Sequence, residues 1–421
     1  MSKFIVRPGP SLSGTVVVSG AKNSVLKLMA ACLLAPGRHT LRNVPRITDV
    51  AIMMDLLTEM GVISSWESGN ILSIDVPEDL SPEARYEHVE KMRASIVVLG
   101  PLVSRLGQAK VSMPGGDDFG SRPIGMHLNG LESMGAISDI SHGYVNCHLP
   151  PGQDRLVGAR IVLEFPSHTT TDNLMMAAVL AKGTTIIENA AREPEVVDLA
   201  SFLDSMGARI QGAGTSRIEI EGVDSLTPSE HSVIPDRVET ATFLAAVGIA
   251  GGEINLMGGR FNHLDMFIEK MGEMGVRISP TQGGLWALSP GRLESTDIAT
   301  LPYPGVATDY KPLVTTLLTV AEGVGIVTEN LFSGRFKYID ELKRMGADIR
   351  TEGHHAVIRG VPKLSGTIVR ASDIRAGAAL VLAGMVAEGE TTVMGIDHID
   401  RGYENFDKKL SALGADIVRV Q

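Results

Sequence analysis

Apolar residues recur at helical spacing and then stop at a glycine six times along this 421-residue chain. The six segments read LLTEMGV, LESMGAI, FLDSMGARI, MGEMGVRI, ELKRMGADI and KLSALGADI, and their glycines are Gly61, Gly135, Gly207, Gly275, Gly346 and Gly414. Successive glycines are 74, 72, 68, 71 and 68 residues apart, which gives one repeat across the whole chain. Because each glycine precedes a short β-branched run, the pattern predicts a helix C-cap that leads into a strand.

The first half of each repeat carries a second pattern. Polar residues open it, a helical stretch rich in Ala, Leu and Met follows, and a glycine then precedes a strand rich in Thr, Val and Ile. The pattern occupies residues 22–44, 170–190, 308–330 and 373–395, and the segments from Arg93 and Asp236 fit it. The sequence therefore predicts six helix–strand–helix–strand units, three in each globular domain. Their central helices are apolar nearly all round, so we expect them to be buried.

The starts of these six helices share polar or charged residues, which are Lys22 and Asn23, Arg93 and Ser95, Thr171 and Asp172, Glu239 and Thr240, Thr308 and Asp309, and Asp373 and Arg375. A helix N-terminus exposes unpaired amides and the positive end of the dipole, and both favour an anion. A Thr or Asp there is also an ordinary helix cap. Lys22, Arg93 and Arg375 oppose the dipole, so we interpret them as functional. If the three helices of a domain are parallel, their starts converge on one face.

Composition narrows the classes of function. Hydrophobic residues make up 44% of the chain and charged residues 21%, as is typical of a soluble globular protein. A net charge of −11 and an aromatic content of 4% argue against a nucleic-acid or anionic-membrane surface. The two cysteines lack CxxC spacing, and we find no apolar run of about 18 residues. We therefore expect a cytoplasmic protein that binds no nucleic acid, membrane or metal and is a monomer.

The segment 111–123, VSMPGGDDFGSRP, places two adjacent aspartates and an arginine among three glycines. Such a segment can be a surface turn, a metal-binding loop or an acid catalyst beside an anion site. We do not expect a metal site, because no His or Glu accompanies the aspartates at ligand spacing. The residues alone leave the turn and the catalytic loop open.

Several longer motifs occur in order along the chain. They are GAKNSVLKLMAA at 20–31, MRASIVVLGPLV at 92–103, PGG and GSRP within 114–123, IIENAAREPEVVD at 186–198, IPDRVETATF at 234–243, TD at 308–309, EN and RF within 329–336, SDIRA at 372–376 and HIDRGY at 398–403. Over essentially its full length, the chain thereby resembles the UDP-N-acetylglucosamine enolpyruvyl transferase family. So many motifs in the same order are not a chance match.

The resemblance implies a fold and a division into domains. The enolpyruvyl transferase fold is of the α/β (α+β) class and has two inside-out α/β barrel domains. Each domain has three repeated βαβαββ-like units around buried parallel helices. The resemblance also places the N-terminal strand with the C-terminal half. We therefore expect one domain at 22–235, which carries the catalytic loop 111–123, and a second at 1–21 plus 236–421, with the active site in the cleft between them.

The resemblance further implies an activity. Such enzymes transfer the enolpyruvyl group of phosphoenolpyruvate to the 3'-hydroxyl of UDP-N-acetylglucosamine, release phosphate and use no cofactor, in the first committed step of peptidoglycan synthesis. The reaction needs an acid to protonate the methylene carbon, a base for the hydroxyl proton and cations for the phosphate and carboxylate. By resemblance Asp117 is the acid, and Asp309 is the base or orients the hydroxyl. Lys22 and Arg401 then hold the reaction centre.

Other residues are assigned to substrate binding by the same resemblance. Arg122 would hold the phosphate, Asn23 the acceptor sugar and Arg93 the nucleotide. The residues that it places near the phosphoenolpyruvate are Arg335, Asp373 and Arg375. The remaining candidates for substrate contact are Pro123, Ile124, Gly125, Met126, Ser167, His168, Thr169 and Thr308.

The chain departs from the family in the proton donor. The family usually has cysteine directly after Pro-Gly-Gly, and Asp117 stands there in this chain. A carboxyl with a pKa of about 3.9 is a poor donor at pH 7, so desolvation or a bound phosphate must raise that pKa. A rise of about three units corresponds to roughly 4 kcal/mol between the protonation states. Asp118 is the alternative donor. The substitution predicts resistance to fosfomycin, an epoxide that alkylates the thiol of cysteine-bearing members.

Further departures lie where the family contacts the nucleotide. Gly125 replaces a typical aspartate, His168 and Thr169 replace Val-Gly, and Lys311 replaces a typical glutamine. His168 is either a loop histidine with its own partners or a phosphate ligand, while Lys311 is either solvated or adds positive charge to the cleft. Two alternative functions stay open. One is a related enolpyruvyl transferase that acts on another uridine nucleotide such as UMP, and the other is a pseudoenzyme that binds the nucleotide without turnover.

Overall fold

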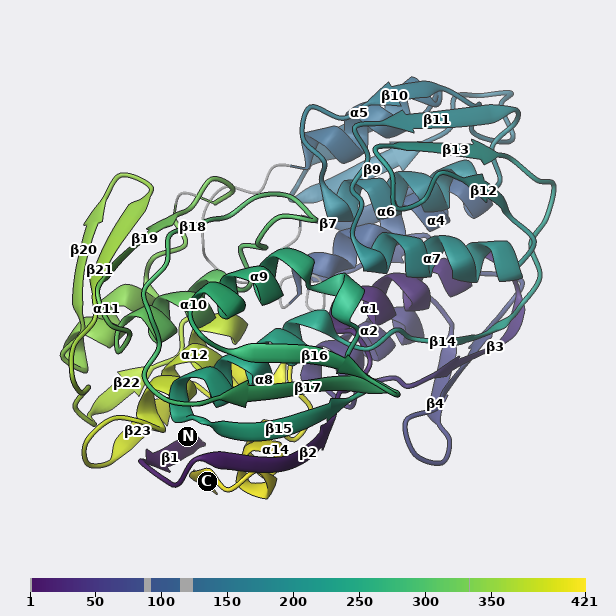
Figure 1. Ribbon diagram of the computed structural model, residues 1–421. Helices are drawn as coiled ribbons and strands as arrows, with labels where there is room; N and C mark the ends of the chain where they lie inside the picture. Colours follow the sequence, from purple (N-terminus) through teal and green to yellow (C-terminus); the bar gives the residue numbers. More distant parts are fainter. Residues whose placement is uncertain (1, 87–91, 114–123, 333) are drawn as a thin grey trace. The chain divides into compact units, whose positions relative to one another are not determined.

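The computed structural model describes residues 2–86, 92–113, 124–332 and 334–421. These residues divide into two compact units (Figure 1). We call residues 20–113 and 124–234 the central unit, and residues 2–19 with 235–421 the terminal unit. Residues 114–123, which include most of the segment singled out in the sequence, lie outside the described residues.

The described part of the central unit contains three four-stranded sheets. The first consists, in spatial order, of β14 (Glu230–Ser232), β3 (Gly37–Arg42), β5 (Leu72–Val76) and β4 (Ile63–Trp66). The second consists of β6 (Glu83–Ala84), β7 (Gln108–Ser112), β9 (Tyr144–His148) and β8 (Ile137–Ser141). The third consists of β10 (Arg160–Val162), β11 (Thr184–Glu188), β13 (Arg217–Glu221) and β12 (Arg209–Gln211).

The described part of the terminal unit also contains three four-stranded sheets. One consists of β2 (Leu12–Val17), β15 (Gly252–Met257), β17 (Gly284–Ser289) and β16 (Arg277–Thr281). The next consists of β18 (Ile298–Ala299), β19 (Val324–Thr328), β21 (His355–Arg359) and β20 (Asp348–Glu352). The last consists of β22 (Ile368–Arg370), β23 (Thr391–Met394), β1 (Lys3–Arg7) and β24 (Asp416–Val420).

All six sheets have the same topology. In the orders given, the first two strands are parallel and each later neighbour is antiparallel. The two N-terminal strands complete sheets of the C-terminal half, because β2 pairs with β15 and β1 lies between β23 and β24. In β1, Ile5 lies opposite Thr392 on one side and Val418 on the other. The six repeats and the predicted α/β fold class are thereby confirmed.

Buried helices form the interior of each unit. In the central unit they are α1 (Lys22–Ala31), η2 (Arg93–Val98) with α4 (Leu99–Leu106), and α6 (His168–Ala178). In the terminal unit they are α8 (Arg237–Ala250), α10 (Lys311–Leu318) and α12 (Ile374–Gly384), which pack against one another. Every residue of α10 and α12 is buried, as their all-round apolar pattern predicts.

A second set of helices ends in the repeated glycines. These are α2 (Thr48–Glu59), α5 (Gly125–Ser133), α7 (Pro194–Ser205), α9 (Asp265–Glu273), α11 (Tyr338–Arg344) and α14 (Phe406–Ala412). Three short helices, η1 (Cys32–Leu34), η3 (Phe261–His263) and α13 (Asp397–Asp400), complete the described elements.

The six repeated glycines end their helices with one hydrogen-bond pattern. Each glycine has a φ between 89° and 106°, the left-handed conformation that favours glycine. After α2, the amide of Val62 donates to the carbonyl of Leu57 at 3.0 Å across Gly61, and the equivalent bond follows each of the other five glycines. This bond is that of a Schellman motif, so the predicted C-caps are confirmed.

The start of α6 differs from the sequence expectation. The helix begins at His168, where the hydroxyl of Ser167 caps it by accepting from the amide of Thr170 at 3.3 Å. Thr171 and Asp172 therefore lie inside the buried helix and are not its first residues. A capping serine gave little signal here because an unbroken run of polar residues follows it.

Each unit has its own hydrophobic core. One extends over buried residues between Ala21 and Ile234, and the other over Phe4 to Val18 and Val238 to Ile417. Within the described ranges, the helices are too short or too polar to cross a bilayer.

Candidate functional site

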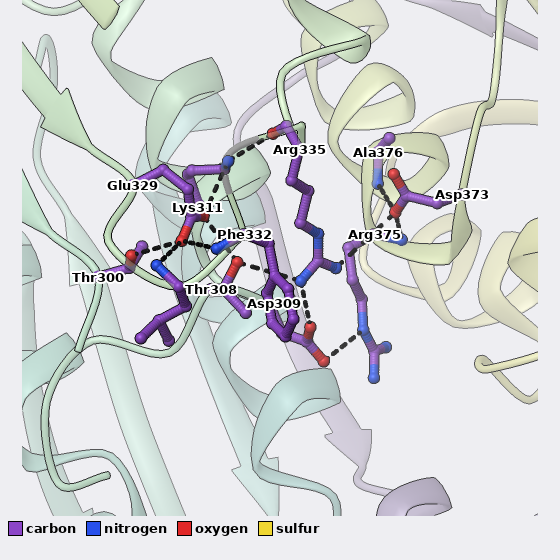
Figure 2. A network of polar contacts seen from close by, with 11 residues as sticks. Thr300, Thr308, Asp309, Lys311, Glu329, Phe332, Arg335, Asp373, Arg375 and Ala376 are labelled. Atoms are coloured by element: carbon purple, nitrogen blue, oxygen red, sulfur yellow. Dashed lines mark hydrogen bonds and ion pairs between the residues drawn. The ribbon is translucent and has the colours of Figure 1, made fainter. Parts of the chain in front are cut away.

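Asp309 lies between two buried arginines in the terminal unit (Figure 2). Its Oδ1 accepts a hydrogen bond from Nη1 of Arg335 at 2.8 Å, and its Oδ2 lies 3.4 Å from Nε of Arg375. The arginine side chains are 4% and 3% exposed, whereas the side chain of Asp309 is 25% exposed. Buried cations therefore hold a carboxylate that still reaches solvent.

Helix starts meet around this carboxylate. Asp309 lies two residues before α10, and Arg375 is the second residue of α12. The third helix, α8, contributes its first residue, because Nη1 of Arg237 donates to the hydroxyl of Tyr310 at 2.9 Å. Within the terminal unit, the starts of α8, α10 and α12 thus converge as the repeat pattern predicts.

The two arginines keep their charge. Burial lowers the pKa of Arg335, but the carboxylates of Asp309 and Asp373 outweigh burial and raise it above its ordinary value. Burial likewise lowers the pKa of Arg375, and the neighbouring Tyr403 and Asp309 raise it overall. Both groups are therefore cations at any physiological pH.

Asp373 has two relationships in the cluster. Its Oδ1 caps α12 by accepting from the amides of Arg375 at 2.9 Å and Ala376 at 3.0 Å. The same oxygen lies 4.0 Å from Nη2 of Arg335. Capping and pairing with the arginine therefore use one carboxylate.

Glu329 connects the segments that carry these residues. It follows β19 and is buried, and its Oε1 accepts from Thr300 Oγ1 and the amide of Leu331 at 2.8 Å and from the amide of Phe332 at 3.1 Å. Its Oε2 accepts from the hydroxyl of Thr308 at 2.8 Å. Nη1 of Arg335 in turn lies 3.2 Å from that hydroxyl, so Glu329 orders both sides of the Asp309–Arg335 pair.

Lys311 is fully buried, so the first of the two alternatives for it, a solvated lysine, is excluded. Its Nζ lies 2.8 Å from Oε2 of Glu329, donates to the carbonyl of Arg335 and sits 3.9 Å from the centre of the Phe336 ring. Burial lowers the pKa of Lys311 to about 8, although Glu329 opposes the shift. Burial raises the pKa of Glu329, but Lys311 and the hydrogen bonds outweigh it and leave that pKa below its ordinary value.

The start of α1 carries the candidates Lys22 and Asn23 in the central unit. Nζ of Lys22 lies 2.9 Å from Oδ2 of Asp49 on α2, whose side chain is 1% exposed. The carbonyl of Asn23 accepts from Nζ of Lys27 one turn further along α1. Lys22 therefore has a buried counter-ion that sequence reasoning did not identify.

His168, a candidate in the sequence, contacts a buried ion pair. Nε2 of His168 lies 3.2 Å from Oδ2 of Asp172 and 3.5 Å from Nζ of Lys27. The Asp172 carboxyl is completely buried, and burial raises its pKa to about 7 against the opposing effect of Lys27 at 3.6 Å. His168 is the first residue of α6, which corrects its placement in a loop. Its ring contacts Asp172 and Lys27 of this chain.

The other candidates in the central unit lie at helix starts. Ser167 caps α6, and Thr169 is half-buried in its first turn. Ile124 is buried at the start of α5, Gly125 is exposed, and Met126 is half-buried. Arg93 begins η2.

Of the remaining candidates, the structure describes Arg401 but not the three candidate residues of the segment 114–123. Arg401 is half-buried at the C-terminal end of α13 in the terminal unit. Asp117, Arg122 and Pro123 lie outside the described residues, so their assignments stay predictions. The structure thus brings together Thr308, Asp309, Arg335, Asp373 and Arg375, all in the terminal unit.

Sequence reasoning missed several polar residues of these clusters. Glu329 was noticed only within a motif, although a buried Glu directly after a predicted strand is itself a signal. Lys27 gave no such signal, because apolar residues surround it in the chain, and Asp49 gave none that distinguishes it from an ordinary residue near a helix start. Among the described residues, no group of three His, Cys, Asp or Glu side chains is placed to hold a metal ion.

The chemistry available at Asp309 follows from its surroundings. A partly exposed carboxylate can accept a proton from a bound hydroxyl, and the adjacent guanidinium groups can pair with a phosphate or carboxylate. The site therefore suits a reaction in which a hydroxyl attacks an anionic substrate.

Comparison with known proteins agrees with these features. The model of the family EPSP synthase (3-phosphoshikimate 1-carboxyvinyltransferase) matches residues 6–410. The chain is 49% identical to a UDP-N-acetylglucosamine 1-carboxyvinyltransferase of Thermodesulfovibrio yellowstonii over 422 aligned residues, which cover 100% of both chains. It is 48% identical to UDP-N-acetylglucosamine 1-carboxyvinyltransferase 1 of Caldanaerobacter subterraneus over 99% of both chains.

Solved structures share the fold at lower sequence identity. The enolpyruvyl transferase NikO from Streptomyces tendae has a TM-score of 0.88 and 24% identity, covering 100% of this chain and 99% of its own. EPSP synthase from Acinetobacter baumannii has a TM-score of 0.77 and 19% identity, covering 100% of both chains. At these identities the likeness supports the fold and carries no information on the acceptor.

Proposed function

The chain belongs to the EPSP synthase family of 1-carboxyvinyl (enolpyruvyl) transferases, and from that premise we propose that it transfers the enolpyruvyl group of phosphoenolpyruvate to the 3'-hydroxyl of UDP-N-acetylglucosamine. Inorganic phosphate is the second product, and the reaction serves peptidoglycan synthesis. Support comes from two relatives of that name that are 48–49% identical over essentially their whole length.

The observation that carries the proposal is the Asp309 carboxylate between Arg335 and Arg375. In the forward reaction the acceptor hydroxyl adds to C2 of phosphoenolpyruvate while C3 gains a proton, which gives a tetrahedral ketal phosphate. Loss of phosphate and of a C3 proton then restores the double bond and gives the enolpyruvyl ether. Asp309 takes or orients the hydroxyl proton, and the two arginines hold the carboxylate and phosphate of the donor.

The other candidate residues complete this assignment. We assign Lys22 and Arg401 to the anionic reaction centre and Asn23 to the acceptor sugar. The residues that we assign to further substrate contacts are Arg93, Arg122, Pro123, Ile124, Gly125, Met126, Ser167, His168, Thr169, Thr308 and Asp373. Asp117 is the acid that protonates C3, which makes the enzyme resistant to fosfomycin because the alkylated thiol is replaced by a carboxyl.

One assay tests the proposed function. The purified chain is incubated with phosphoenolpyruvate and one acceptor at a time, and phosphate release is measured with UDP-N-acetylglucosamine, UMP and shikimate 3-phosphate. We expect release with UDP-N-acetylglucosamine alone. Release with UMP alone would replace the acceptor, and binding of UDP-N-acetylglucosamine without release from any mixture would show a pseudoenzyme.

A further inference from the structure

Lys311 stands at an unfavourable place for a cation. Its side chain is completely buried, and it is the first residue of α10, where the positive end of the helix dipole opposes a positive charge. Burying an ammonium group costs several kcal/mol unless it is paired and hydrogen-bonded. A lysine at this position therefore needs contacts that offset the cost of burial. Those contacts identify the segments of the chain that Lys311 holds in place.

Its contacts reach the segment that carries Arg335. Nζ of Lys311 donates to the carbonyl of Arg335 (Figure 2). The same Nζ lies against the ring of Phe336, so Lys311 fixes the main chain at the arginine itself. Arg335 then extends to Asp309, 2.8 Å from Nη1 to Oδ1. A shift of that main chain would move the guanidinium with it.

A second route runs through Glu329. The same Nζ pairs with Oε2 of Glu329 at 2.8 Å, and this oxygen also accepts from the hydroxyl of Thr308, the residue before Asp309. Lys311 therefore supports both members of the Asp309–Arg335 pair, one through a carbonyl and the other through a carboxylate.

We propose that Lys311 is a positioning residue for the donor-binding cations of this site, because it fixes Arg335 through the main chain and Thr308 through Glu329. The inference rests on the proposed function, since it assigns Arg335 to the anionic donor substrate. Lys311 itself is buried and contacts neither substrate, so its loss should weaken donor binding and leave acceptor binding unchanged.

Several charged or titratable groups face Lys311 from the elements around it. Glu329 follows β19, Arg335 lies on the next segment, Tyr338 begins α11 with its ring centre 6.0 Å from Nζ, and Asp373 caps α12. The pKa of Tyr338 is raised by burial, and that of Arg335 is raised by its carboxylates. The pKa of Lys311, about 8, lies within the pH range of an assay.

The test compares three variants of the full chain with the wild type. Lys311→Met removes the donor and the charge, Lys311→Gln keeps one hydrogen-bond donor, and Lys311→Met combined with Glu329→Gln removes both charges of the pair. The matched control is Lys270→Met on α9, which breaks the Lys270–Glu273 pair of 2.8 Å elsewhere in the terminal unit. KM and kcat are measured for donor and acceptor between pH 6 and 10.

We expect Lys311→Met to raise KM for phosphoenolpyruvate about tenfold to a hundredfold, the loss expected for a hydrogen bond to a charged group. KM for the acceptor should change less than about twofold. The double variant should keep the raised KM, whereas Lys311→Gln should recover most of the loss. Above pH 8 the neutral amine of Lys311 still donates to the carbonyl of Arg335, so KM for the donor should stay lower in the wild type than in Lys311→Met up to pH 10.

Two results would overturn the proposal. If the double variant regains the wild-type KM for phosphoenolpyruvate, Lys311 serves only to neutralise Glu329. If Lys311→Met changes the two Michaelis constants no more than Lys270→Met does, Lys311 does not position Arg335 or Thr308.

The proposal can also be tested when the enzyme shows no turnover. The Nε–H resonance of Arg335 in protein labelled with ¹⁵N-arginine, assigned by its loss in Arg335→Lys, reports the guanidinium directly. It should shift and broaden in the double variant and remain in Lys270→Met. An unchanged resonance refutes the positioning role, whereas absent phosphate release in the wild type refutes the proposed function alone.

Discussion

Nη1 of Arg335 lies 2.8 Å from Oδ1 of Asp309 and 3.2 Å from the hydroxyl of Thr308. One buried guanidinium thus sets the direction of a carboxylate that is itself partly exposed. The carboxylate is thereby held in one orientation, while part of it stays accessible to a bound hydroxyl.

We predict that Asp309→Asn lowers kcat by about 10²- to 10⁴-fold, the range for loss of a general acid or base, because the amide cannot take the hydroxyl proton. Phosphate release gives kcat, and calorimetric titration gives acceptor affinity, which should change little. The control is Asp348→Asn on β20, whose side chain is 62% exposed. A wild-type kcat in Asp309→Asn would remove Asp309 from the chemistry.

The second prediction concerns Asp117 and thiol reagents. The chain has two cysteines, Cys32 and Cys147, which are 0% and 1% exposed, and burial raises the pKa of both thiols. The native wild type should therefore react with no equivalent of an aromatic disulfide and should keep its activity in fosfomycin. Asp117→Cys should react with one equivalent of the disulfide. If this variant releases phosphate in the absence of fosfomycin, it should lose that activity when fosfomycin is added.

Asp117→Asn provides the matching control for the acid. It should abolish turnover while leaving nucleotide binding largely intact, because the amide has no proton to donate to carbon. Rapid inactivation of the wild type by low fosfomycin would contradict the assignment of Asp117, and so would full turnover in Asp117→Asn.

The third prediction concerns the buried Asp172 and pH. Its pKa is about 7 in the folded chain and 3.8 in the reference state, so the folded state binds more protons between these values. The stabilisation from the protonated carboxyl is complete below pH 3.8 and is lost as pH rises through about 7, by roughly 4 kcal/mol at most. Asp172→Asn mimics the protonated form, so its stability relative to the wild type should rise from pH 5 to pH 8.

The midpoint of urea unfolding measures this difference in a Trp286→Phe background, where Trp66 on β4 reports the central unit. The control is Asp154→Asn, because Lys182 lowers the pKa of Asp154 further below its ordinary 3.8, so this carboxylate stays ionised from pH 5 to pH 8. A difference between Asp172→Asn and wild type that does not change with pH would refute the prediction.

The repeats were predictable because they rest on local chemistry. A left-handed glycine with a buried residue four positions before it needs only a few neighbours, so Gly61 and its five equivalents can be read from spacing alone. The buried helices α10 and α12 were predictable for a similar reason, since no polar face interrupts them.

Other features depend on contacts between distant segments. The run of Thr170, Thr171, Asp172 and Asn173 reads as the polar start of a helix but is buried inside α6, which begins at His168. Residues such as Asn173 are satisfied by remote partners, here the amide of Gly100 at 2.7 Å. The burial of Lys311 likewise depends on Glu329, 18 positions away, which no local pattern reveals.

The last prediction separates glycine's conformational role from its lack of a side chain. Gly272 and Gly275 lie three residues apart at the end of α9, and a Cβ at either position would meet no atom within 4 Å beyond the adjoining chain. Gly275 has a φ of 99°, whereas Gly272 lies within the helix. Gly275→Ala should therefore destabilise the terminal unit by about 1–2 kcal/mol, and Gly272→Ala should stabilise it by about 0.5–1 kcal/mol.

Unfolding midpoints in a Trp66→Phe background, where Trp286 on β17 reports the terminal unit, measure both effects. Trp286 lies in the sheet whose edge strand β16 follows Gly275, so it reports the element that the substitution strains. Because both sites are open, any difference in sign comes from the backbone. Equal shifts for the two variants would mean that the left-handed conformation at Gly275 carries no cost for alanine, and the shared Schellman motif would then not explain the six-fold recurrence of glycine.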